Sequence, residues 1–135
     1  MTDFEMISVT FEMINTLWAI FGIYVSIVFA FLVVSYLAAS QLASRLVAIV
    51  ITLYTLVALW SFWGLNRSAA TLSSALAEIQ RAVAEGRSSL AWYPGVSIPE
   101  LMLTIIPLLV TAIAVIAYVG SIAFFFHQRR ATSSG

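Results

Sequence analysis

The sequence predicts an all-α integral membrane protein with three transmembrane helices and one amphipathic helix in the loop between the second and the third. The 135-residue chain is 62% hydrophobic and only 9% charged, and its mean hydropathy is +1.05. A soluble domain has about 25% charged residues. The few charged residues also leave three uncharged stretches, each long enough to cross a bilayer once. We expect residues 1–135 to form a single membrane domain.

The spans follow from these uncharged stretches, which are Met13–Ser44, Leu46–Asn66 and Leu101–Gln128. A hydrocarbon core about 30 Å thick needs roughly 20 helical residues, so we place the spans at 17–39, 46–65 and 101–126. Each segment must satisfy its own backbone hydrogen bonds in lipid, which makes it a helix. The first span is expected to be retained and not cleaved as a signal peptide, because its flank has three acids and no base.

The amphipathic helix is predicted at residues 68–86. Its apolar residues recur at helical spacing and form one stripe, made of Leu72, Leu76, Ile79 and Val83. The opposite face carries Glu78, Arg81 and Glu85, at spacings that favour ion pairs. This balanced charge favours docking onto protein over binding to anionic lipid. The sequence leaves open whether this helix continues the second span or breaks from it, and we favour a bend near 64–66. We expect a stop at Gly86 and a loop over 87–99.

The orientation follows weakly from the arginines. With three spans, one side of the membrane has Arg45, Arg129 and Arg130, and the other has Arg67, Arg81 and Arg87. This count is a tie, but the first span has a basic residue only at its C-terminal flank. We therefore predict a multi-pass protein with the N-terminus outside and the C-terminus in the cytoplasm.

The tryptophans all fall on one side of a three-span protein. They are Trp18, Trp60, Trp63 and Trp92, and Glu12, Arg67 and Glu100 belong to the same level. Tryptophan favours the headgroup region, because its ring is apolar and its N–H needs a partner. This set is either a binding site at that membrane face or an aromatic anchor belt with helix caps, and belts are the commoner arrangement.

Few residues could support chemistry. The sequence has no cysteine, and its single histidine has no second ligand nearby in the sequence, so we expect no metal, no cofactor and no catalytic residue. The spans hold no ionisable side chain of the kind that proton relays use. A net charge of zero argues against nucleic acid as a partner. The chain is therefore not expected to be an enzyme.

Small residues at spacings of three or four favour close helix packing. They are Gly22, Ser26 and Ala30 on the first span, and Ala114, Ala117 and Ser121 on the third. These stripes fit one compact bundle, and the first fits dimerisation equally well. The main hypothesis is a non-enzymatic accessory or assembly subunit that acts through helix–helix contacts, with membrane lipids and either a membrane-protein partner or further copies of itself as partners.

Two alternatives remain. The size, the three predicted spans and the basic C-terminal end at Arg129 and Arg130 resemble the layout of three-span phage holins, although no motif is shared. This resemblance implies a self-associating pore or lesion former; the long loop over 68–99 departs from the short connections of holins. The other alternative is an interfacial binder of lipid or of a small apolar ligand that uses the four tryptophans.

Overall fold

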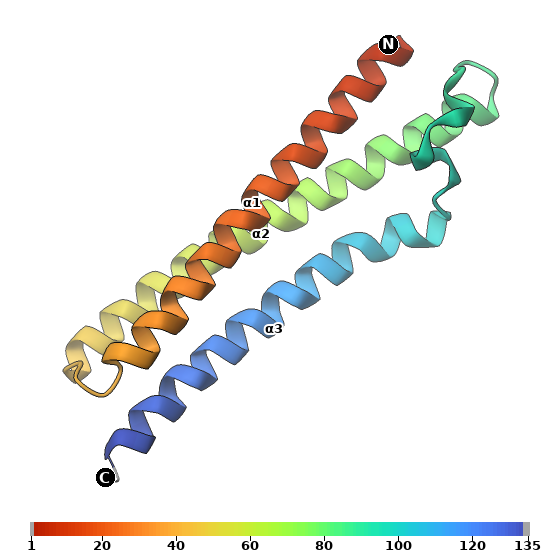
Figure 1. The fold of residues 1–135 in the computed structure, drawn as a ribbon. Coiled ribbons are helices and arrows are strands. Elements are labelled where there is room, and N and C mark those ends of the chain that lie inside the picture. Colours follow the sequence, from red (N-terminus) through yellow and green to blue (C-terminus); the bar gives the residue numbers. More distant parts are fainter. Residues whose placement is uncertain (1, 134–135) are drawn as a thin grey trace.

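The computed structural model describes residues 2–133 and consists of three long helices, shown in Figure 1: α1 (Asp3–Ala38), α2 (Ser44–Ala84) and α3 (Glu100–Ser133). Each is long and apolar enough to cross a membrane, which confirms the predicted all-helical fold with three membrane-length helices. The two ends of the chain lie at opposite ends of the bundle (Figure 1). Two short 3₁₀ helices, η1 (Leu90–Trp92) and η2 (Pro94–Ser97), interrupt the connection between α2 and α3.

Helix α1 starts well before the predicted span. Thr2 caps it: the Thr2 backbone N–H donates to Glu5 Oε2 at 2.8 Å, and the Glu5 N–H donates to Thr2 Oγ1 at 3.3 Å. This reciprocal capping box satisfies two N–H groups that a helix start would otherwise leave unpaired. With 36 residues, α1 is about 54 Å long, which exceeds the thickness of a hydrocarbon core.

The amphipathic segment does not form a fourth helix in the loop, and the favoured bend is wrong. Residues 68–84 are the C-terminal half of α2, which runs for 41 residues without a break at 64–66. Contacts with other helices accompany this continuity: Leu65 is buried in a cluster with Tyr24 of α1 and Ala114 of α3, and Asn66 Nδ2 donates to Thr111 Oγ1 at 3.2 Å. The predicted stop is confirmed, because α2 ends at Ala84 and Gly86 takes a φ of 68°.

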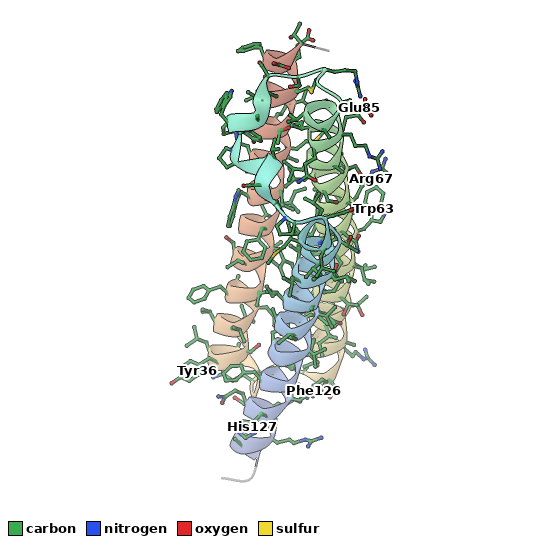
Figure 2. The ribbon with its side chains drawn as sticks, turned by 90° about the vertical axis from the view of Figure 1, so that its right-hand side faces the viewer. Tyr36, Trp63, Arg67, Glu85, Phe126 and His127 are labelled. Atoms are coloured by element: carbon green, nitrogen blue, oxygen red, sulfur yellow. The ribbon has the colours of Figure 1, made fainter. Side chains whose placement is uncertain are left out.

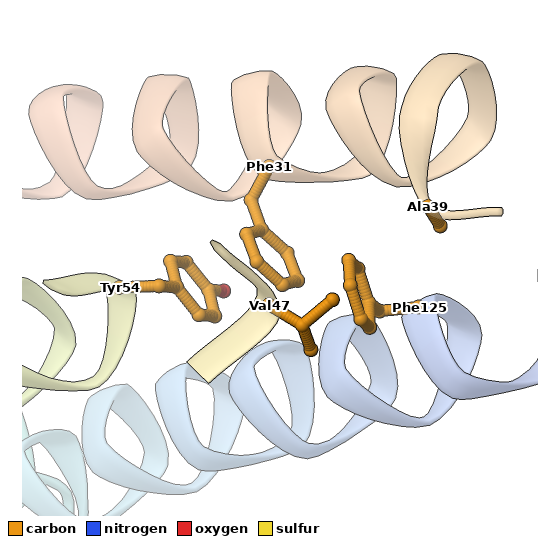
Figure 3. Close-up of a cluster of buried hydrophobic side chains, with 5 residues drawn as sticks. All are labelled: Phe31, Ala39, Val47, Tyr54 and Phe125. Atoms are coloured by element: carbon orange, nitrogen blue, oxygen red, sulfur yellow. The ribbon is translucent and has the colours of Figure 1, made fainter. Parts of the chain in front are cut away.

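Three clusters of buried apolar side chains run along the bundle axis. The cluster nearest the C-terminus stacks Phe31 on Tyr54, with ring centroids 3.9 Å apart, and places Phe125 against Phe31 at 5.6 Å (Figure 3). The middle cluster centres on Tyr24 and Ala114. Because each cluster takes residues from all three helices or their ends, the three helices form one bundle.

Hydroxyl groups link the helices inside this bundle. Tyr24 Oη donates to the Ala114 carbonyl at 2.7 Å, which joins α1 to α3. Tyr54 Oη and Ser121 Oγ lie 2.7 Å apart and join α2 to α3. In the described part of the chain, no buried side-chain nitrogen or oxygen lacks a hydrogen-bond partner. The interior polar groups therefore have their hydrogen-bond partners within the bundle.

The small-residue stripes have different surroundings. On α3, Ala114 and Ser121 are buried and Ala117 packs against the middle cluster. On α1, by contrast, Gly22, Ser26 and Ala30 are exposed, and a Cβ added at Gly22 would have no heavy atom within 4 Å. The α1 stripe therefore takes no part in packing within the chain and faces outward.

Candidate functional site

The polar end of the bundle is built from the first turns of α1, the last turns of α2 and the connection between α2 and α3. We call residues 3–16, 67–84 and 85–99 together the stalk. Its core buries the predicted apolar stripe of α2: Leu72 and Leu76 pack with Leu103, Met13 and Tyr93. The stripe thus docks onto the protein's own helix ends and linker.

The linker is fastened to the stalk at two places. Asp3 accepts hydrogen bonds from Ser88 Oγ at 2.7 Å and from the N–H and Oγ of Ser89 at 3.0 and 2.6 Å. These bonds favour the charged carboxylate, so they lower the pKa of Asp3 below its ordinary value of 3.8. At the second place, Gln80 Nε2 donates to the carbonyls of Gly95 and Ile98.

A groove runs along the stalk between α1 and α2. Its part farther from the apolar spans has a volume of about 510 Å³ and its nearer part about 320 Å³. The α1 wall consists of Met6, Val9, Thr10, Glu12, Met13 and Thr16. The α2 wall is mostly small, with Ser68, Thr71, Ser74, Ala75 and Ala82, and with Arg67, Glu78 and Ile79 among them; Arg87 reaches it from the linker. The α1 wall thus carries the larger apolar side chains, Met6 and Met13, among polar ones, and the α2 wall carries mostly small side chains.

Two of the predicted site residues meet in this groove. Glu12 and Arg67 both line its nearer part, and both are exposed. The Arg67 guanidinium lies over the Trp63 ring, 5.4 Å from its centroid, and Figure 2 shows both side chains projecting from α2. Glu100 begins α3 and does not line the groove.

The four tryptophans do not converge on a pocket. Trp18, Trp60, Trp63 and Trp92 are all exposed, by 62 to 71%. Trp18 packs edge-on against Phe21 and Trp92 against Tyr93, each within its own element or its immediate neighbour. Exposure of this kind suits contact with lipid headgroups or with another protein more than enclosure of a small ligand.

The predicted ion pairs on the polar face of α2 do not form. Among residues 2–133, the salt bridge present joins Glu85 to Arg87, with Nη2 and Oε2 2.5 Å apart. Glu78 and Arg81 make no ion pair there, and Glu85 pairs with Arg87, which the turn at Gly86 brings back to it. Two acids, Glu12 and Glu78, therefore line the groove without a basic partner within the described chain.

The opposite end of the bundle has a different character. Arg129 donates to the Leu42 carbonyl at 3.2 Å and lies 3.5 Å from Ser44 Oγ, so it ties α3 to the short α1–α2 turn. Tyr36, Phe126 and His127 lie at this end (Figure 2). Within residues 2–133, no group of three or more His, Cys, Asp or Glu side chains is placed to hold a metal ion.

Comparisons with protein-family models, with curated proteins and with solved structures each give no match for this chain.

Sequence reasoning missed the α1 wall of the groove. Met6, Val9, Met13 and Thr16 recur at spacings of three and four residues, but they precede the predicted start of the first span. The pattern Thr2-x-x-Glu5 would have found them, since it is a capping-box signature. It predicts a helix that begins at Asp3 and carries those residues on one face.

Proposed function

We propose that this protein is a non-enzymatic membrane component, an accessory or assembly subunit, that acts through helix–helix contacts made by its stalk. The observation that carries the proposal is the contrast between interior and stalk. The buried hydroxyls of the bundle bond to backbone carbonyls or to one another, whereas the stalk leaves a long groove with acids that have no basic partner in the described chain. Such a surface is suited to a second helical protein surface.

The distribution of charge supports a position of the stalk outside the lipid. Arg45 and Arg67 bracket the apolar part of α2, and the 21 residues between them correspond to about 32 Å of helix, close to the thickness of a hydrocarbon core. Residues 68–84 then project about 25 Å beyond it. The arginines at the other end, Arg45, Arg129 and Arg130, support a cytoplasmic C-terminus and an external stalk.

The composition supports a role without catalysis. The spans carry no ionisable group that could move a proton, and the groove offers carboxylates and an arginine but no activated nucleophile. The shape of the groove suits the binding of another protein surface.

The test is affinity purification of the tagged full chain from its native membrane, with two matched variants of α2. Ala75→Trp fills the groove, and Ala70→Trp adds the same ring on the exposed side of the same helix, outside the groove. We expect membrane proteins, or further copies of the chain, to co-purify with the unaltered chain. They should be lost with Ala75→Trp and kept with Ala70→Trp. Recovery of the unaltered chain as a lone monomer would contradict the proposal.

A further inference from the structure

The two walls of the stalk groove are complementary to each other in side-chain size. The α1 wall presents Met6, Val9 and Met13, which are long or branched and apolar. The α2 wall at the same height presents Thr71 and Ala75, which are small. In one chain the two walls lie beside each other and leave the groove open. The groove would be filled by a surface that sets large side chains against the α2 wall and small ones against the α1 wall.

A second copy of this chain is such a surface. Two membrane proteins of the same orientation are related by a twofold axis along the membrane normal, and each then presents the same patch to the other. Groove against groove, α1 of one copy packs on α2 of its partner, so Val9 faces the small residues around Ala75. The groove residues of both helices recur at spacings of three and four, which is the pattern of helices packed in a four-helix bundle.

The charges agree with the same arrangement. Glu12 on α1 and Arg67 on α2 line the same part of the groove, and neither forms an ion pair within residues 2–133. The twofold axis places Glu12 on α1 of each copy beside α2 of the other copy, on the face of α2 that carries Arg67. Two equivalent pairs of opposite charge are gained.

We propose that the stalk groove is the interface of a parallel homodimer, in which α1 and α2 of two copies form a four-helix bundle outside the bilayer with Glu12 paired to Arg67 across the twofold axis. This inference rests on the proposed function and names its partner as a second copy of the chain. The rival surface is the outward stripe of Gly22, Ser26 and Ala30 on α1.

A charge-reversal mixture tests the proposal on the full chain in liposomes at low protein density. Donor and acceptor fluorophores are fused to the C-terminal end of separate copies, and energy transfer reports dimers. Glu12→Arg and Arg67→Glu each place like charges in both pairs, so each variant alone should dimerise roughly tenfold less than the unaltered chain. Both side chains are exposed, so both variants keep the fold.

The mixture of the two variants gives the decisive result. In the heterodimer, Arg at position 12 faces Arg67→Glu of the other copy, and the native pair re-forms on the other side, so energy transfer should return to within about twofold of the unaltered level. Pairing within one chain cannot give this rescue, because each variant still carries like charges at both positions. A mixture no better than either variant alone, or an unaltered chain that stays monomeric, would overturn the proposal.

Two further measurements separate the rival surface and the wider function. Gly22→Leu adds bulk to the outward stripe and should leave dimerisation unchanged; loss of the dimer in this variant together with normal dimerisation of Glu12→Arg would overturn the groove assignment. If no dimer forms but a different membrane protein still co-purifies and is lost with Ala75→Trp, the homodimer fails while the assembly function stands. Loss of both would refute the two together.

Discussion

The hydroxyl pair of Tyr54 and Ser121 allows a prediction whose sign depends on which group donates. Ser121 Oγ donates its single hydrogen to the Tyr118 carbonyl at 2.8 Å. The contact of 2.7 Å between Tyr54 Oη and Ser121 Oγ must therefore be a bond that Tyr54 donates. Both side chains are buried, with 5% and 2% of their surface exposed, so neither hydroxyl can turn to water.

The two obvious substitutions should therefore differ in cost. Tyr54→Phe removes the donor and leaves Ser121 with its own bond intact, so we expect a loss of about 0.6 kcal/mol in the free energy of unfolding. Ser121→Ala leaves the Tyr54 hydroxyl as a buried donor without its acceptor, which costs about 1–3 kcal/mol. The measurement is reversible unfolding of the full chain in mixed micelles, followed by circular dichroism.

Tyr36→Phe serves as the control, because Tyr36 is 70% exposed and the loss of its hydroxyl should change the unfolding free energy by less than about 0.5 kcal/mol. Equal costs for Tyr54→Phe and Ser121→Ala, or a larger cost for Tyr54→Phe, would refute the assigned donor direction. If neither Tyr54→Phe nor Ser121→Ala changed the unfolding free energy, α2 and α3 would not meet in this register.

Four predictions concern the linker. Asp3→Ala removes the bonds to Ser88 and Ser89, so tryptic cleavage after Arg87 should become severalfold faster at neutral pH, with Ser97→Ala as a control. Because the pKa of Asp3 is lowered in the folded protein, its contribution is full above 3.8 and is lost only as the pH falls through the lower folded value; hydrogen exchange at the Ser89 amide should stay slow at pH 5, and fast exchange there would contradict this. Gln80→Leu leaves two linker carbonyls without their donor and should cost about 1–3 kcal/mol in the unfolding measurement; an unchanged value would show that water replaces the amide. Gly95→Ala would place a Cβ 2.7 Å from Tyr93 and 2.8 Å from Leu76, so it should lower stability by about 1–3 kcal/mol, and wild-type stability would indicate that these two side chains move aside.

The spans were predictable because lipid imposes a simple length rule. Each uncharged stretch had to be helical over about 20 residues, and the three helices cover the predicted segments except for Ala39, which caps α1. Helix ends were harder to predict from hydropathy, since α1 continues into polar sequence back to Asp3. There the capping box, and not apolar content, determines the start.

The continuity of α2 could not be read from the sequence. Gly64 and Asn66 each favour a break when considered alone, but the neighbouring Leu65 is buried against α1 and α3, and Asn66 bonds to Thr111, which is distant in the chain. Tertiary packing outweighs local preference at such positions. The stalk groove is invisible for the same reason, because it requires knowing that α1 and α2 extend together beyond the spans.

The candidate site was partly predictable. Glu12 and Arg67 were singled out by their level at the end of the spans, and the structure places both in the groove. Glu100 belongs to the same predicted level but begins a different helix, away from the groove. The height of a residue along the bundle axis can be counted from the sequence. The neighbour that its side chain faces depends on how the helices pack, which involves residues distant in the chain.

Accessibility of single cysteines to a membrane-impermeant maleimide tests the central claim, that the stalk stands clear of the lipid while the three helices cross it. The sequence has no cysteine, so each introduced thiol reports alone. In sealed vesicles with the stalk side facing out, Ala70→Cys on the stalk should react fully, and Leu53→Cys, which is exposed on the apolar part of α2, should react only after detergent is added. A protected Ala70→Cys, or a freely reactive Leu53→Cys, would contradict the account.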